Sequence, residues 1–152
     1  MSKATLYRFC RTREQLIDRL FAHCAVLLLR SLDEAELEKG PPIEGLRRLI
    51  QGQMAHRELT SFLIYYWKPD SVTDPRAEET WNTFQDGMDA FFLRGQHEGA
   101  FRIDISAATL TETLLSLLSG LVDAERRGRV PRIGMATTVE RLFLAGAVSA
   151  VK

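Results

Sequence analysis

The chain has 152 residues, of which 45% are hydrophobic and 26% are charged, so it fits one globular domain and is not disordered over most of its length. A domain of this size buries roughly 70% of its unfolded surface, which means that its core needs no disulfide or metal. Twenty Lys and Arg residues balance twenty Asp and Glu residues, so the overall charge gives no indication of a nucleic-acid partner.

No segment predicts a membrane-spanning or exported protein. The longest uncharged apolar run near the start, residues 20–29, is too short to cross a bilayer. Basic residues precede it, as in a signal peptide, but Glu14 and Asp18 lie among them and no small-residue cleavage site follows. We therefore expect a cytoplasmic protein in which Cys10 and Cys24 are reduced thiols.

Charge is unevenly distributed along the sequence. Residues 1–13 contain basic side chains and no acidic one, whereas residues 33–38 contain acidic side chains and no basic one. The basic segment suits a polyanion such as DNA, although a solvated helix end would have the same composition. The charge pattern alone leaves both interpretations open.

Apolar residues recur at intervals of three and four, which predicts an all-α helical bundle. Thr12 and Gln15 form a capping box, so a helix begins there. It should continue to Glu38, just before Gly40, over about 27 residues or roughly 40 Å. Pro42 suits the first position of the next helix. The long first helix is expected to join two parts of the molecule.

The second half of the chain carries three more predicted helices. An aromatic-rich segment, residues 62–67, precedes a helix that begins after Asp74, carries a wide aromatic face and ends at Gly99. Asp104 is expected to cap a Leu-rich helix. A basic loop, residues 128–134, then leads to the last helix.

The last two helices carry more apolar surface than one neighbour would cover. The Leu-rich helix is apolar nearly all round, and the last helix has small residues along one stripe. Two such helices from each of two copies would bury this surface in a two-fold homodimer, and burial inside a single chain is the alternative. The expected interface residues are Leu114, Leu117, Leu118, Leu121, Leu142, Phe143 and Gly146.

No pattern typical of catalysis or metal binding is present in the sequence. None of His23, His56 and His97 lies three or four residues from another histidine or a suitable cysteine. The sequence also lacks a G-x-S-x-G motif, a Gly-rich phosphate loop and a Cys–His nucleophile pattern. We expect no enzyme activity, cofactor or metal, and an enzyme that uses an aromatic cavity is the weakest alternative.

The first residues form a specific motif. Residues 2–9 have the sequence SKATLYRF, and residues 12–16 have the sequence TREQL. The two segments resemble the recognition helix and the following helix start of TetR-type bacterial repressors, whose usual form is S-K-x-T-L-Y-x-[HY]-F and then [SN]-K-E-x-L. The rest of the chain resembles this family in its helix layout.

The resemblance implies a division of the chain into two parts. Residues 1–11 would be the remnant of a helix-turn-helix DNA-binding domain, and residues 12–152 an effector-binding and dimerisation domain. Hydroxyl, basic and small side chains on a recognition helix suit base edges and phosphates. The DNA-binding positions implied are Ser2, Lys3, Ala4, Thr5, Tyr7, Arg8 and Arg13. Cys10 departs from the family's pattern and is expected to be a buried filler, with a redox switch as the alternative.

The family also binds a small effector among its middle helices, which implies a pocket in the aromatic region of this chain. Ordinary core packing is the alternative for most of these side chains. The expected effector is small and largely apolar, because few charged residues accompany the aromatic ones. The expected lining residues are His56, Phe62, Tyr66, Trp81, Gln85 and Met88.

These features together predict a TetR-type transcriptional regulator, a repressor whose effector lowers its affinity for an operator duplex. In the family the recognition helix is the third helix, whereas here the motif begins at residue 2. We therefore expect this chain to be an N-terminally incomplete form that binds DNA weakly as it stands. The alternative is a truncated helical ligand-binding dimer without DNA-binding activity.

Overall fold

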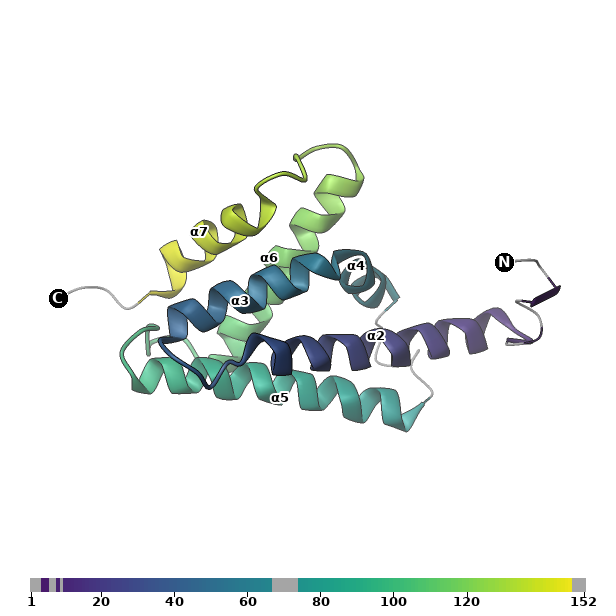
Figure 1. Cartoon of the computed structure of the whole chain (residues 1–152), viewed down its shortest axis with the longest axis horizontal. Helices are drawn as coiled ribbons and strands as arrows, with labels where there is room; N and C mark the ends of the chain where they lie inside the picture. The colour runs from purple at the N-terminus through teal and green to yellow at the C-terminus, as the bar shows by residue number, and fades with distance from the viewer. Residues whose placement is uncertain (1–3, 6–7, 9, 67–73, 149–152) are drawn as a thin grey trace.

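The computed structural model describes residues 4–5, 8, 10–66 and 74–148, without the side chains of residues 60 and 64–66. The described residues form an all-α bundle, as the sequence predicts, with one isolated antiparallel bridge between Phe101 and Val148. Its helices are α2 (Arg13–Ala35), α3 (Pro42–Ala55), α4 (Arg57–Tyr66), α5 (Pro75–His97), α6 (Ala107–Arg126) and α7 (Met135–Ala147) (Figure 1).

The helix α2 begins where the sequence predicts. Thr12 is its N-cap, and the Thr12 Oγ1 atom accepts a hydrogen bond from the backbone N–H of Gln15 at 3.2 Å. The Gln15 side chain accepts from the backbone N–H of Arg11 at 3.0 Å, one residue earlier than in a standard capping box. Together these bonds satisfy backbone donors at a helix start that is exposed to solvent.

The predicted end of this helix at Glu38 is wrong, because α2 ends at Ala35. Glu36 has a left-handed conformation (φ 46°), which stops the helix. The Arg48 guanidinium donates to the carbonyl oxygens of Ala35, Glu36 and Lys39 at 2.7, 3.1 and 2.9 Å. An arginine from the next helix therefore satisfies carbonyls that an additional helical turn would have used.

The helix α5 begins after Asp74, whose carboxylate accepts from the backbone N–H of Arg76 at 2.9 Å. It ends before Gly99, which has the positive φ (75°) expected of a glycine after a helix end. Both helix boundaries agree with the sequence prediction.

The predicted cap of α6 at Asp104 is wrong. Ser106 is the N-cap, and its Oγ accepts from the backbone N–H of Thr109 at 3.1 Å. The Asp104 carboxylate is bound instead by both ends of the Arg102 guanidinium, at 2.6 and 2.5 Å. A bidentate charged pair therefore takes the carboxylate that the sequence assigned to the helix start.

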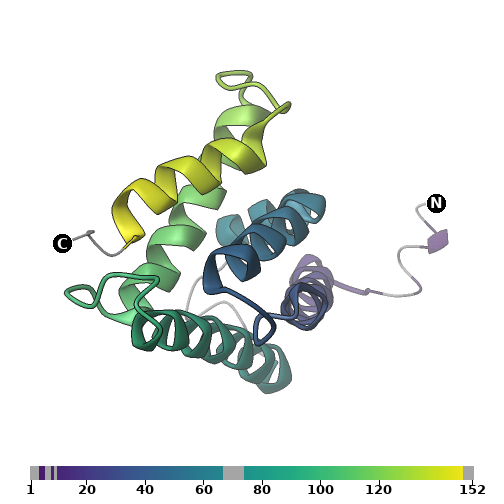
Figure 2. The same ribbon diagram turned by 60° about the vertical axis from the view of Figure 1, so that its left-hand side comes forward.

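The core lies where α2, α3, α5, α6 and α7 meet. α2 packs along α5 and also contacts α3 and α4, while α3 also packs on α7 (Figures 1 and 2). In Figure 2, α3 lies between α2 and the pair formed by α6 and α7. The rings of Phe91, Phe92, Phe101 and Phe143 form a chain of tilted and edge-to-face contacts with centroid distances of 5.2–5.8 Å. No helix among the described residues is long and apolar enough to cross a membrane.

Candidate functional site

The segment with the recognition motif lies at the free end of α2. Ala4, Thr5 and Arg8 are helical, with Ala4 and Arg8 exposed and Thr5 half-buried. Arg13 is the first residue of α2 and is also exposed. The other predicted DNA-binding residues, Ser2, Lys3 and Tyr7, lie outside the described residues.

The first turns of α2 extend past the other helices of the bundle (Figure 1). Residues 11–15 are exposed, and Leu20 and Val26 are 39% and 56% exposed. Toward the other end, Leu28, Ser31 and Leu32 are buried against the bundle. A single helix therefore runs from the recognition segment into the core, so a displacement in the core can reach the recognition segment through it.

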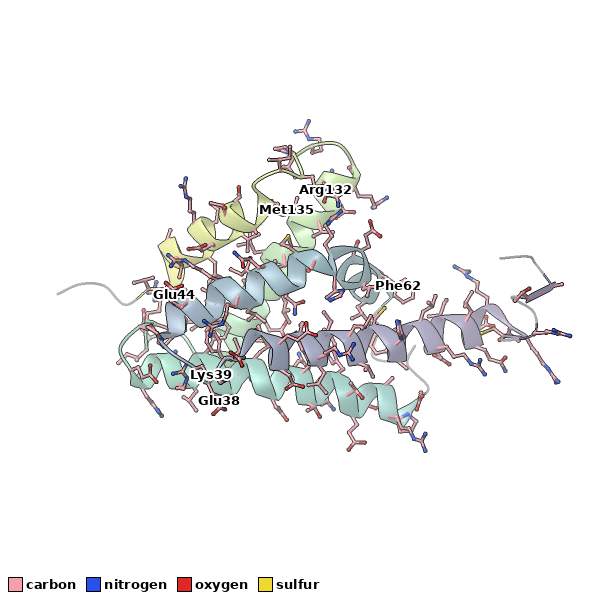
Figure 3. All side chains as sticks on the ribbon, viewed as in Figure 1. Glu38, Lys39, Glu44, Phe62, Arg132 and Met135 are labelled. Atoms are coloured by element: carbon pink, nitrogen blue, oxygen red, sulfur yellow. The ribbon has the colours of Figure 1, made fainter. Side chains whose placement is uncertain are left out.

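The predicted effector residues have different environments. Met88 is fully buried in the core, whereas Phe62 and Trp81 are half-buried against it. Phe62 projects from α4 on the side of the bundle from which α2 extends (Figure 3). His56 is the half-buried C-cap of α3, and the Tyr66 side chain lies outside the described residues.

Gln85 lies at the junction of α5 and α6, where its amide donates to the carboxylate of Glu112 at 2.9 Å. A groove of about 480 Å³ lies between the end of α2 and α5. Its lining includes Leu29, Leu37, Asp33 and Glu38, and none of the six predicted effector residues.

The predicted interface residues divide into two groups. Leu114, Leu118 and Phe143 are at most 3% exposed and pack in the core of their own chain, so the prediction of these three as interface residues is wrong. The helix spacing could not distinguish the inner face of α6 from its outer face. Leu117 and Leu121 are half-buried, Leu142 is 55% exposed and Gly146 is exposed.

The outer face of α6 is hollowed by a groove of about 460 Å³ between small and polar side chains. Its lining residues are Ala108, Thr109, Glu112, Thr113 and Ser116. This groove and the second group of interface residues therefore remain at the surface of the single chain.

Comparison with known proteins identifies the family. No family model matches the chain. The chain is 47% identical over 148 residues to NfxB, an HTH-type transcriptional regulator of Pseudomonas aeruginosa, and the match covers 97% of this chain and 79% of NfxB. Among solved structures it resembles PfmR, a TetR family transcriptional regulator from Thermus thermophilus (TM-score 0.71, 21% identity, 96% of this chain and 82% of PfmR). The chain belongs to the HTH-type transcriptional regulators, and it has the fold of the TetR family regulator PfmR.

Two further structures share the fold. The MbdR regulator from Azoarcus sp. CIB gives a TM-score of 0.75 at 19% identity and covers 94% of this chain and 81% of its own. A protein of unknown function from Rhodococcus sp. RHA1 gives a TM-score of 0.75 at 18% identity, and the match covers 98% of this chain and 85% of that protein. NfxB and PfmR are transcriptional regulators.

A buried polar pair in this TetR-type bundle was not singled out from the sequence. Ser31 of α2 and Gln53 of α3 are 2% and 1% exposed. The Gln53 amide nitrogen donates to Ser31 Oγ at 2.6 Å, and Ser31 Oγ donates to the Leu28 carbonyl at 2.6 Å. Gln53 Oε1 is buried without a hydrogen-bond partner. The detectable signal was a glutamine at the spacing of the buried apolar positions of its helix, Leu49 and Ile50.

The cysteines and the acidic groups form no reactive or metal-binding centre in the described part of the chain. Cys10 and Cys24 are buried free thiols, and burial raises the pKa of Cys24 to about 11. Within the described ranges, no three His, Cys, Asp or Glu side chains are grouped so that they could hold a metal ion.

Proposed function

We propose that this TetR-type regulator is a dimeric repressor whose operator affinity falls when a small effector binds among its helices. The observation that carries the proposal is the course of α2, which runs from the exposed recognition segment to a buried end packed on α3 and α5. The C-terminal end of α2 is bonded to α3 through Arg48, and the turn that follows it is bonded to α5 through Arg94, which donates to the Leu37 carbonyl at 2.6 Å. A helix held at one end and free at the other converts a small shift in the core into a larger one at the DNA.

The exposed residues of the recognition segment supply the DNA contacts in this proposal. Thr5 and Ala4 would face base edges, while Arg8 and Arg13 would bind phosphates. Arg13 lies in the first turn of α2, where free backbone N–H groups also favour an anion. In a two-fold dimer the two recognition helices would enter successive major grooves about 34–36 Å apart.

The outer surfaces of α6 and α7 form the dimer contact in this proposal. The half-buried Leu117 and Leu121, the exposed Leu142 and the glycine at position 146 remain available to a partner, and the α6 groove offers small side chains for close packing. Leu142 is the largest exposed apolar side chain of this group.

The effector in this proposal is small and largely apolar. Phe62, Trp81 and His56 are half-buried and Met88 is buried in the core, and in this proposal they contact the effector. Aromatic side chains with a few polar groups are typical of ligand sites between the helices of a bundle.

DNA binding is tested by fluorescence anisotropy with the duplex that lies directly upstream of the protein's own gene and a scrambled duplex of equal length. We expect tighter binding to the first duplex, with an affinity that falls as salt rises. Arg13→Ala should lower the slope of log affinity against log salt by about 1. The matched control is Arg30→Ala, an exposed arginine of the same helix far from the recognition segment. Equal effects of the two variants would remove the repressor proposal and favour a ligand-binding dimer without DNA-binding activity.

Dimerisation is tested by sedimentation velocity at micromolar concentration. Leu142→Glu should dissociate the dimer without unfolding the chain, because this side chain is 55% exposed within one copy. Leu93→Glu on α5, where the leucine is 48% exposed, is the matched control and should leave the dimer intact. A monomer in the unmodified protein would contradict the proposed interface.

A further inference from the structure

The polar pair Ser31–Gln53 interrupts two apolar helix faces at the point where they meet. On α3 the buried positions are Leu46, Leu49, Ile50 and then Gln53, and on α2 Ser31 lies between buried leucines. Each polar side chain thus occupies a position at which helical spacing favours an apolar residue. Because the two departures are bonded to one another, they form one polar element inside the core.

The direction of the hydrogen bonds determines which atom is left over. Ser31 Oγ gives its proton to the Leu28 carbonyl, so toward Gln53 it acts as an acceptor and requires the amide nitrogen. The carbonyl oxygen of the same amide then points away from Ser31. Among the residues that the structure describes, this Gln53 Oε1 atom is the one buried side-chain acceptor without a partner. More than nine in ten buried polar groups in proteins are hydrogen-bonded, so a donor is missing at this atom.

The chemistry of the surrounding core restricts what the donor belongs to. Within the described residues, the fully buried polar side chains are Ser31, Gln53 and Thr111, and the Thr111 hydroxyl is bonded to the carboxylate of Asp89 at 2.5 Å. No fully buried charge is among them, so a charged ligand would enter this region without a counter-ion, which is strongly unfavourable. A neutral molecule with an apolar body and one hydroxyl or N–H group fits this environment.

We propose that Gln53 Oε1 is the acceptor that recognises the effector, through a hydroxyl or N–H donor on a neutral and otherwise apolar molecule. This inference rests on the proposed effector function and assigns its specificity to one atom. The same amide holds Ser31 of α2, which lies 18 residues, or about 27 Å along the helix axis, from Arg13. A ligand that rotates or shifts the Gln53 amide therefore acts directly on the helix that carries the recognition segment.

The test uses two probes of nearly equal shape, phenol and toluene, which differ in the presence of a donor. Their dissociation constants for the full chain are measured by calorimetry, and the side-chain amide of Gln53 is followed by ¹H–¹⁵N NMR. Gln53→Met removes the acceptor and keeps the side-chain length. Gln51→Met, an exposed glutamine two residues earlier on the same helix, is the matched control.

In the unmodified protein we expect the preference for phenol over toluene to exceed that in Gln53→Met by about tenfold, which corresponds to one hydrogen bond of about 1.4 kcal/mol. Gln51→Met should behave as the unmodified protein. The Gln53 side-chain amide signal, which is identified by its absence from the spectrum of Gln53→Met, should shift when phenol binds to the unmodified protein. Equal preferences in all three proteins would overturn the role of Gln53 while leaving an effector pocket in place. If neither probe binds, the effector pocket fails together with this inference. A bound-water signal at the Gln53 amide that persists at saturating phenol would assign the donor to a structural water and overturn the inference.

Discussion

Gly95 is the position at which the structure makes the sharpest prediction about stability. It lies in the last turn of α5 and is buried. A Cβ atom at this residue would lie 2.3 and 2.4 Å from two ring carbons of Phe101 and 3.3 Å from a side-chain carbon of Pro42. Carbon atoms in contact are normally about 3.5–4.0 Å apart. Gly95→Ala therefore forces the Phe101 ring to move by about 1 Å.

That ring cannot move freely, because Phe91 and Phe92 contact it at centroid distances of 5.8 and 5.2 Å. The Gly95 carbonyl also accepts from the backbone N–H groups of Ala100 and Phe101. Overpacking of a well-packed core costs about 1–3 kcal/mol, and a displacement of this size belongs at the upper end. The better helix propensity of alanine returns about 1 kcal/mol. The net expectation is a loss of about 2 kcal/mol, or a melting temperature lower by roughly 4–8 °C.

Thermal and urea unfolding, followed by circular dichroism at one fixed protein concentration, measure this loss. The matched control is Gly52→Ala in the middle of α3, where the nearest atom to a new Cβ is 3.9 Å away. This control should be stabilised by up to about 1 kcal/mol, because the helix gains propensity without a clash. A Gly95→Ala variant as stable as the unmodified protein would show that the ring contact does not restrict this position.

Four further expectations follow from the structure. Arg48→Met should lower the free energy of unfolding in urea by about 2 kcal/mol, because the carbonyls of Ala35 and Lys39 lose their side-chain donor, while that of Glu36 keeps the Lys39 N–H; an unchanged midpoint would contradict the role of this arginine. Gln53→Met should raise the free energy of unfolding by about 1 kcal/mol, because it removes a buried acceptor without a partner, and a large loss would refute this. Cys24, whose pKa is raised to about 11 by burial, should react with a disulfide reagent at pH 8 only as the protein unfolds; rapid labelling of the native protein would be inconsistent with its burial. The Arg102 guanidinium lowers the pKa of Asp104 from its ordinary value, so this pair stabilises the fold above the ordinary pKa of an aspartate and the contribution is lost as pH falls through the lowered value. Because the pair is exposed, Asp104→Asn should reduce the loss of stability in acid only slightly; a larger loss of stability in acid than in the unmodified protein would contradict the direction of this shift.

The sequence predicted helix starts well, because the signals for them are local. The side chains of Thr12 and Asp74 bind backbone N–H groups two or three residues away, and Pro42 begins α3 as expected. The stop at Gly99 is equally local, since its positive φ is accessible to glycine without strain.

The incorrect helix boundaries depend on which side chain reaches which oxygen. The end of α2 is set by Arg48, which comes from 12 or more residues away to bind the carbonyls of Ala35 and Glu36, and Arg94 binds the Leu37 carbonyl in the turn that follows. Asp104 does not cap the helix because it is bound by Arg102, two residues before it. The spacing of residues does not show whether a carboxylate will bind such an arginine or a backbone N–H at the helix start. The outcome in both regions was therefore decided by an arginine.

The functional surfaces differ in how well a sequence can predict them. The recognition motif is a run of consecutive residues, so its resemblance to a family was visible at once, and the relation to NfxB agrees with it. The interface required knowledge of which side of α6 faces inward. Spacing at three and four residues places Leu114, Leu117, Leu118 and Leu121 on one broad apolar stripe of the helix. The fold buries Leu114 and Leu118 in the core and leaves Leu117 and Leu121 half-buried at the edge of that stripe.

The pair Ser31–Gln53 shows why polar residues on apolar helix faces carry information that periodicity discards. A single polar residue on an apolar helix face is compatible with a helix that turns slightly toward solvent. The helical periodicity alone therefore does not indicate that Ser31 or Gln53 is buried. Their hydrogen bond shows that both are interior, and an interior amide with one unused acceptor is less favourable than the leucine that the pattern would place there. Stability therefore does not account for Gln53, whereas recognition of a donor that arrives and leaves does, because such a site must keep its acceptor available between binding events.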